Sequence, residues 1–112
     1  MGPYLTTPVT EKETEDNENK AVQYGACSMQ GWRKSQEDTH IANISLKDGN
    51  MVFAVFDGHG GKEVSIYVEK VFVKMLTDLP EYKNGNYKES LTKCFKAIDT
   101  ELCMPEGQMQ LK

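Results

Sequence analysis

Three consecutive residues, Asp57, Gly58 and His59, have the side chains and spacing best suited to chemistry in this sequence. They follow an unbroken apolar run, residues 52–56, which is typical of a strand buried on both faces. Such a strand delivers its terminal groups to one point at the edge of a rigid sheet. Asp57 offers oxygen ligands for Mg²⁺ or Mn²⁺, the Gly58 carbonyl can approach a metal closely, and His59 can donate a proton.

The same three residues also fit an ordinary turn between a strand and a helix. In that interpretation Asp57 caps a helix that begins near Lys62, the glycines make the bend, and His59 lies in solvent. The tripeptide alone leaves both interpretations open.

A second polar cluster spans residues 33–38. The adjacent acids Glu37 and Asp38 can hold metal-bound water, and the planar guanidinium of Arg33 can clasp a phosphate. The alternative is a solvated charged loop. Neither cluster is specific by itself, and their order along the chain carries more information than either alone.

The apolar pattern predicts the elements that would position these groups. Strands are expected at residues 22–29, 39–46 and 51–56, and the Asp48-Gly49 pair predicts a hairpin between the last two. The loop after the first strand and the end of the third would then lie at one end of a sheet. Helical spacing of apolar residues predicts helices at 62–76 and 87–102.

The resulting fold class is α+β, with antiparallel strands flanked by helices. On the first helix the apolar stripe is expected to comprise Val64, Val68, Val71 and Met75. Nothing in the sequence supplies a second layer over residues 51–56, so we expect this strand to expose apolar surface. Residues 1–21 are acidic and poor in apolar side chains, and we expect a flexible leader there, with the folded domain at 22–112.

Composition excludes several functional classes. The 112 residues carry a net charge of −4, with 17 acids against 13 bases, which disfavours nucleic acid or an anionic membrane as partner. Three cysteines without a C-x-x-C pair indicate neither a disulfide framework nor a thiolate zinc site. No segment resembles a membrane span or secretory signal, so a cytoplasmic location is expected, with nuclear presence as an alternative. The opening Met1 to Thr6 fits a myristoylation pattern at Gly2, and membrane contact is expected only if that residue is acylated.

Several motifs, in order and at matching intervals, resemble the start of the PPM (PP2C-type) metal-dependent serine/threonine phosphatases. The likeness runs from about Tyr24 to Met75, and its carriers are Met29-Gln30-Gly31-Trp32-Arg33, then Glu37-Asp38, then residues 52–60. The resemblance implies a catalytic domain built on a pair of antiparallel sheets flanked by helices, and a site with two Mn²⁺ or Mg²⁺ ions.

The resemblance also implies roles for individual residues. Asp57 would bridge both metals, the Gly58 carbonyl would bind one of them, and Glu37 and Asp38 would lie beside the cluster through bound water. Arg33 would grip the phosphate of a phosphoserine or phosphothreonine protein, and His59 would protonate the departing alkoxide. These roles agree with metal activation of water and neutralisation of phosphoryl charge.

The sequence departs from the family pattern after this region. The family's downstream Asp-Gly-x-Trp-Asp motif and its later Gly-Ser-Thr and Gly-Asp-x-Arg segments do not occur in these 112 residues. We therefore expect an N-terminal portion of the catalytic domain that is inactive or weakly active alone. The alternative hypothesis is a non-catalytic module of the same fold that binds a phosphoprotein or another partner.

Overall fold

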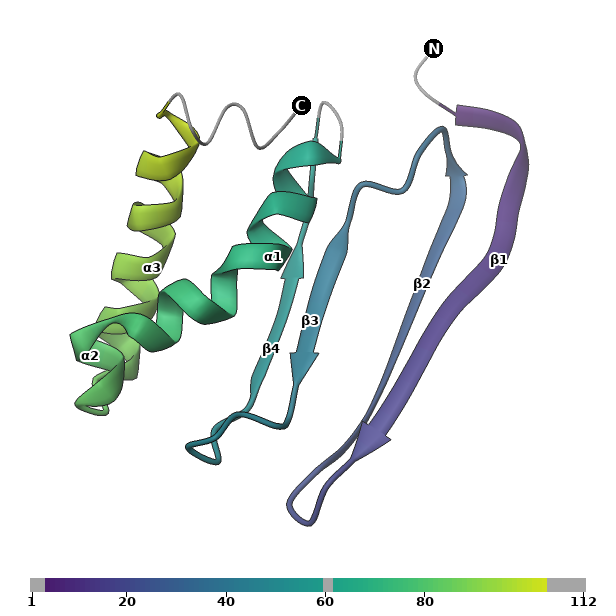
Figure 1. Ribbon diagram of the computed structural model, residues 1–112. Helices are drawn as coiled ribbons and strands as arrows, with labels where there is room; N and C mark the ends of the chain where they lie inside the picture. Colours follow the sequence, from purple (N-terminus) through teal and green to yellow (C-terminus); the bar gives the residue numbers. More distant parts are fainter. Residues whose placement is uncertain (1–3, 60–61, 105–112) are drawn as a thin grey trace.

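The computed structural model describes residues 4–59 and 62–104, and places two antiparallel hairpins beside three helices (Figure 1). The first hairpin pairs β1 (Tyr4–Glu18) with β2 (Gln23–Arg33), and the second pairs β3 (Thr39–Asn43) with β4 (Val52–Phe56). The helices are α1 (Glu63–Asp78), the single turn α2 (Pro80–Lys83) and α3 (Tyr87–Leu102). This arrangement confirms the α+β class.

The hairpins form two separate two-stranded sheets, and β2 does not pair with β3. In the β3–β4 hairpin, Thr39 stands opposite Phe56 and Asn43 opposite Val52. Gly49 adopts φ 84° in its loop, and its N–H donates to the Leu46 carbonyl at 3.1 Å. The predicted hairpin is therefore confirmed, with glycine at the position that needs a positive φ. Its connection, residues 44–51, is longer than expected, because β3 ends at Asn43 rather than at residue 46.

The expected flexible leader is wrong for residues 4–18, which form the whole of β1. The sequence pattern did not indicate this strand, because its charged side chains are exposed and give no apolar alternation. In the pairing with β2, Glu13 stands opposite Ser28 and Glu18 opposite Gln23. Backbone pairing, rather than burial, holds this segment. Gly2 and Gly60 lie outside the described residues.

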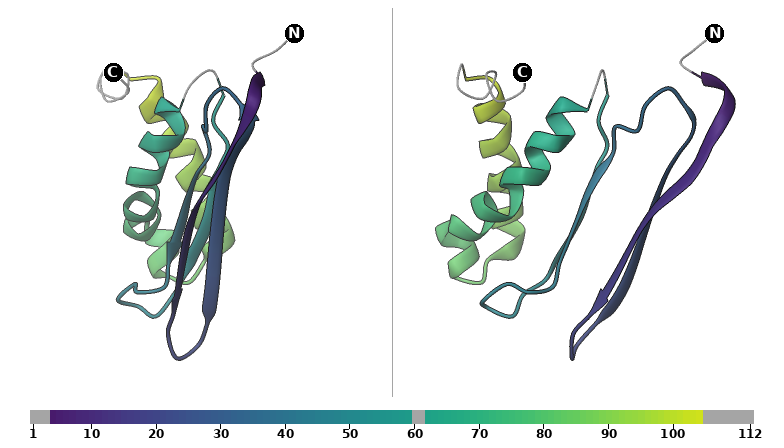
Figure 2. Two further views of the ribbon diagram at one scale, coloured as in Figure 1. Left: turned by 90° about the vertical axis from the view of Figure 1, so that its right-hand side faces the viewer. Right: turned by 45° about the vertical axis from the view of Figure 1, so that its right-hand side comes forward.

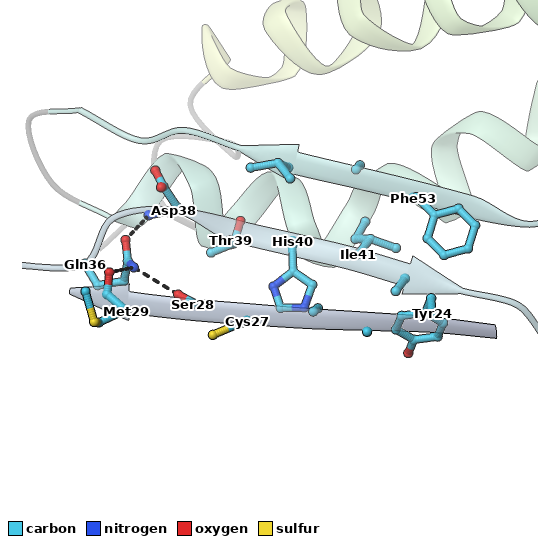
Figure 3. Close-up of a pocket in the computed structure, with 15 residues that line it drawn as sticks. Tyr24, Cys27, Ser28, Met29, Gln36, Asp38, Thr39, His40, Ile41 and Phe53 are labelled. Carbon is cyan, nitrogen blue, oxygen red and sulfur yellow. Dashed lines mark hydrogen bonds between the residues drawn. The ribbon is translucent and has the colours of Figure 1, made fainter. Parts of the chain in front are cut away.

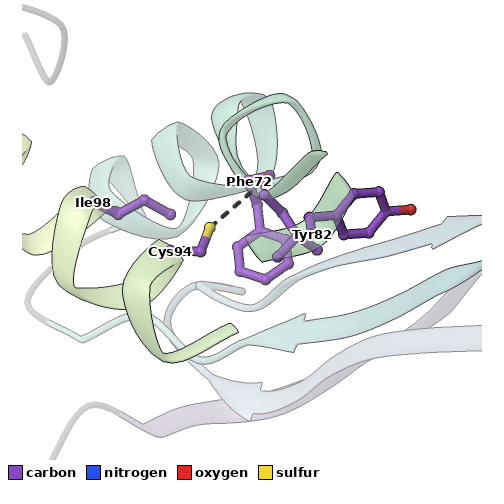
Figure 4. Packing of buried hydrophobic residues seen from close by; sticks show 5 residues of the cluster. Phe72, Tyr82, Cys94 and Ile98 are labelled. Carbon is purple, nitrogen blue, oxygen red and sulfur yellow. Dashed lines mark hydrogen bonds between the residues drawn. The ribbon is translucent and has the colours of Figure 1, made fainter. Parts of the chain in front are cut away.

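The hydrophobic core lies where the helices meet the β3–β4 hairpin (Figure 4). Its buried members come from all three helices, and β3 and β4 contribute partly buried side chains; the buried residues are Phe72, Leu76, Tyr82, Cys94 and Ile98. The Phe56 and Phe72 rings lie 5.4 Å apart between centroids. On α1 the buried stripe is centred on Phe72 and Leu76, whereas Val64 from the expected stripe is 43% exposed.

The helical core covers only one side of β4. Val52 and Phe56 pack against the helical core, while Phe53 and Val55 are 52% and 75% exposed on the other side. Among the described residues, the interpretation of a strand buried on both faces is therefore wrong. The expected exposure of apolar surface along this strand is confirmed. Views from other directions show the helices gathered on one side of the β3–β4 hairpin (Figure 2).

Candidate metal and phosphate site

The register of the β3–β4 hairpin brings the two polar clusters together. Thr39 pairs with Phe56, so the next residues outward, Asp38 and Asp57, stand opposite each other where the strands end. Partial removal from water, and then the charge and hydrogen bonding of Asp57, raise the pKa of Asp38, although Asp38 stays largely exposed. Two carboxylates held this close repel each other, and a divalent cation would relieve that repulsion.

Arg33 and Glu37 belong to the same electrostatic neighbourhood. The positive charge of Arg33 lowers the pKa of Asp38, and the negative charge of Glu37 raises it. The carboxylate of Glu37, however, accepts a hydrogen bond from Ser35 Oγ at 2.9 Å. The charge of Arg33 therefore acts on Asp38, while the Glu37 carboxylate is engaged within its own loop.

His59 and Gly58 lie past the end of β4, beside a hollow of about 440 Å³ between β4, α1 and α3. Within residues 4–59 and 62–104, the His59 side chain makes no hydrogen bond. The residues that begin α1 offer no side-chain cap, so Asp57 does not cap that helix. This excludes the purely structural interpretation of Asp57 as a helix cap.

Helix α1 holds the acidic end of β3 through Ser65, a buried residue. Ser65 Oγ donates to the Glu37 carbonyl at 2.5 Å, and Thr39 Oγ1 donates to the Ser65 carbonyl at 2.9 Å. These bonds flank Asp38 on both sides along the chain. Sequence reasoning missed Ser65, because its partners are backbone groups and a contact across 28 residues leaves no local pattern.

Gln36 ties the same segment to the first hairpin. Its Nε2 donates to Ser28 Oγ at 2.9 Å and to the Met29 carbonyl at 3.2 Å, while its Oε1 accepts from the Asp38 N–H (Figure 3). The side chain lies at the Asp38 end of a cleft of about 510 Å³ between the two hairpins. Gln36 therefore fixes the approach to Asp38, and it was not among the predicted site residues.

The donor set suits a divalent oxygen-seeking cation, although it is a partial one. Asp38 and Asp57 contribute carboxylate oxygens, and these ligands favour Mg²⁺ or Mn²⁺ over softer metals. In the part of the chain that the structure describes, no group of three or more His, Cys, Asp or Glu side chains could hold a metal ion. The pair offers carboxylate oxygens at this edge and does not by itself make a complete metal site.

Two other features bear on possible functions. Burial raises the pKa of the Cys94 thiol, which disfavours a reactive thiolate. No helix among the described residues is long and apolar enough to cross a membrane.

Comparison with known proteins identifies the family. The protein phosphatase 2C profile matches residues 22–109. "Probable protein phosphatase 2C 5" of Paramecium tetraurelia is 46% identical over 111 residues, which are 99% of this chain and 38% of that protein. "Probable protein phosphatase 2C 21" of Arabidopsis thaliana is 42% identical over 108 residues, covering 96% of this chain and 30% of its own length.

The chain thus spans less than two fifths of the length of these curated relatives. The match includes the segment that carries Arg33, Asp38 and Asp57. Because the family profile matches most of its length, this chain belongs to the protein phosphatase 2C family.

Proposed function

We propose that this chain forms the N-terminal part of a metal-dependent protein serine/threonine phosphatase, and that its own residues supply one half of the active site. The observation that carries the proposal is the opposed pair Asp38 and Asp57 beside Arg33, in a chain of the protein phosphatase 2C family. Substrates would be proteins that carry phosphoserine or phosphothreonine.

In this proposal Asp57 and the Gly58 carbonyl would hold Mn²⁺ or Mg²⁺, and Asp38 and Glu37 would contact water at the same site. Bound ions of this kind supply activation of water and neutralisation of charge on phosphoryl oxygens. Mn²⁺ and Mg²⁺ accept the same oxygen ligands, so either ion fits these residues.

The remaining residues act on the substrate. Arg33 would bind two oxygens of the phosphate with its planar guanidinium and orient the phosphorus toward the aspartate pair. His59 would donate a proton to the serine or threonine oxygen as it leaves, because an alkoxide is a poor leaving group without one. Gln36 and Ser65 would hold Asp38 in place.

A chimaera tests this function. This chain replaces the matched 111 residues of the Paramecium relative, and phosphate release from a phosphothreonine peptide is measured with and without Mn²⁺. We expect metal-dependent turnover that falls about 10²-fold or more in Asp57→Asn. Asp78→Asn, which removes an exposed carboxylate on α1, is the matched control and should leave turnover unchanged.

An unchanged rate in Asp57→Asn would contradict the proposed site. A chimaera that binds the phosphopeptide without hydrolysing it would instead support a non-catalytic binding module. An inactive chimaera that does not bind the peptide would reject both functions for this chain.

A further inference from the structure

The loop between β2 and β3 carries an exposed serine beside the candidate site. Ser35 lies two residues after Arg33 and two before Glu37, in a bend outside both sheets. All five serines of the chain fall within the described residues, and only Ser35 and Ser45 are exposed. Ser45 lies in the loop after β3, at the other end of that strand. An exposed hydroxyl in a surface loop is open to a modifying enzyme.

Two cations next to Ser35 have no anionic partner in the described part of the chain. The guanidinium of Arg33 and the ammonium of Lys34 take part in no ion pair or side-chain hydrogen bond there. Arg33 acts on Asp38 through its charge alone. Its five N–H donors form a planar fork that matches the oxygens of a phosphate. Both cations are therefore available to an anion at residue 35.

Hydrogen bonds hold both ends of this loop. Gln30 Nε2 donates to the Arg33 carbonyl at 2.7 Å. At the other end, Gln36 Nε2 donates to Ser28 Oγ on β2, as Figure 3 shows. The two residues from Arg33 to Ser35 span at most about 7 Å of chain. A group attached to Ser35 is therefore kept within reach of the Arg33 side chain.

A phosphoryl group would change the partners of Ser35. In the unmodified chain, Ser35 Oγ donates to Glu37 Oε2 at 2.9 Å. Phosphorylation removes that proton and adds about −1.5 to −2 of charge near pH 7, so the group repels the Glu37 carboxylate and attracts the two cations. The guanidinium is the stronger partner, because it binds two phosphate oxygens at once. The modified side chain would therefore turn from Glu37 to Arg33.

We propose that Ser35 is a phosphorylation site, and that its phosphate occupies the guanidinium of Arg33 and so excludes the phosphate of a substrate. A protein kinase supplies the group from ATP. A bond forms between Ser35 Oγ and the γ-phosphorus, the bond from that phosphorus to ADP breaks, and the hydroxyl proton passes to a base of the kinase. The inhibition rests on the proposed function, whereas the contact between the phosphate and Arg33 does not.

Phosphate transfer tests the site. The basic residues Arg33 and Lys34 before the serine fit a kinase that selects basic residues on that side. The 112-residue chain, as Asp57→Asn so that it cannot remove the phosphate, is incubated with ATP and a kinase of this kind, and mass spectrometry locates the product. We expect Ser35 to be modified at least about tenfold faster than Ser45, which has no basic residue in the three positions before it.

Nuclear magnetic resonance tests the contact with Arg33, without metal or turnover. Chains that carry phosphoserine at position 35, or at position 45 as the matched control, are compared with the unmodified chain. Phosphate at position 35 should shift the Arg33 Nε–H signal and slow its exchange with water about tenfold or more, because the proton enters a charge-assisted hydrogen bond. Phosphate at position 45 should leave both unchanged.

Turnover tests the inhibition. The chimaera with the Paramecium relative receives at position 35 a phosphonate analogue of phosphoserine, which the enzyme cannot hydrolyse. We expect KM for the phosphothreonine peptide to rise about tenfold with kcat little changed, because the peptide binds only the fraction of molecules in which Arg33 is free. The same analogue at position 45 should leave KM unchanged.

Each experiment can overturn its part of the proposal. Equal modification of Ser35 and Ser45 would reject the phosphorylation site. An Arg33 signal that phosphate at position 35 does not move would reject the contact, and an unchanged KM with the phosphonate there would reject the inhibition. A chimaera that is inactive without any modification would contradict the proposed function alone, since the resonance measurement needs no turnover.

Discussion

The two hairpins of this molecule are held in different ways. The β3–β4 hairpin packs one side against the helices, where Ile41, Val52 and Phe56 meet the buried core. The β1–β2 hairpin contributes no side chain to that core, and its only buried residue is Gly31. One hairpin is stabilised by apolar burial, and the other by its own backbone pairing and a few polar contacts.

The contacts that attach the β1–β2 hairpin to the rest are mostly polar. At its turn, Asn19 Nδ2 donates to the Ile44 carbonyl at 3.1 Å. Midway, His40 Nε2 lies 2.7 Å from Glu15 Oε1, and near the other end Gln36 bonds Ser28. The Tyr24 and Phe53 rings add an edge-to-face contact at 5.7 Å. Exposed polar contacts of this kind contribute little each, so this hairpin should open first.

This difference divides the candidate site. Asp38 and Asp57 lie at the end of the well-packed hairpin, whereas Arg33 ends β2 on the loosely attached one. The half proposed to bind metal should therefore be better fixed than the half proposed to bind phosphate.

The largest expected effect is in the core. Phe72→Ala should lower the free energy of unfolding by about 3–5 kcal/mol, because it leaves a cavity among buried helical side chains. Phe95→Ala is the matched control. The centroid of the Phe95 ring lies 5.5 Å from that of Phe72, but Phe95 is 55% exposed. Urea unfolding followed by circular dichroism measures both. Equal losses would contradict a core centred on Phe72.

Removal of the Ser65 hydroxyl should have an intermediate effect. Ser65→Ala leaves the Glu37 carbonyl without its donor and should cost about 1–2 kcal/mol of stability. Ser45→Ala, in the exposed loop after β3, should change stability little. The same urea titration separates the two. A loss no greater than that of Ser45→Ala would mean that α1 does not anchor the acidic end of β3.

A smaller effect is expected where His40 meets the first hairpin. Glu15→Gln should speed amide exchange in β1 and β2 severalfold and leave overall stability almost unchanged. Glu13→Gln is the control on the same strand. Unchanged exchange in Glu15→Gln would mean that this contact does not hold the hairpin.

The same contact should weaken in acid. The Tyr24 hydroxyl, and then His40, lower the pKa of Glu15 below its ordinary value. A lowered pKa in the folded state contributes stability above the unfolded pKa, and that stability is lost as the pH falls through the folded pKa. Exchange in β1 should therefore speed up in that range for the unchanged chain more than for Glu15→Gln.

The smallest expected effect concerns the aspartate pair. Here acid should raise stability, whereas at Glu15 acid should lower it. The pKa of Asp38 is raised, so the folded state holds this proton more tightly than the unfolded chain. The carboxylate pair therefore costs stability above the folded pKa, and the cost disappears as the pH falls toward the unfolded pKa. Relative to Asp38→Asn, the unchanged chain should gain stability on acidification. Thermal unfolding across pH 3 to 7 checks the sign, and an opposite slope would contradict repulsion between Asp38 and Asp57.

Local pattern was enough to predict much of this arrangement. The Asp48-Gly49 pair and the apolar run 52–56 predicted a hairpin whose polar ends lie at one end of the sheet. The register that brings Asp38 to Asp57 was not predicted, because β3 ends at Asn43, which pairs with Val52, rather than at residue 46. The helix at Tyr87–Leu102 was predicted with the same bounds, because its apolar spacing and the preceding Asn-Gly-Asn turn are both local signals.

The rest depended on contacts between distant residues. Residues 10–18 of β1 are all polar or charged, and their backbone pairs with β2, so no apolar alternation there indicated a strand. Phe72 rather than Val64 is buried because α1 packs against both β4 and α3, and a single apolar stripe cannot indicate two neighbours. Ser65 acts through the Glu37 carbonyl, 28 residues away, and Gln36 acts partly through the Met29 carbonyl, and no spacing rule detects such backbone partners.

Mapping of Mn²⁺ on the 112-residue chain by nuclear magnetic resonance tests the central claim most directly. Paramagnetic broadening reports where the ion resides. Two acidic regions could hold it: the Asp38 and Asp57 pair, and residues 11–18 of β1, which carry five acidic side chains. We predict broadening centred on residues 37–38 and 57–58 that is lost in Asp57→Asn. Broadening centred on residues 11–18, unaffected by that substitution, would contradict the assignment of the metal-binding edge.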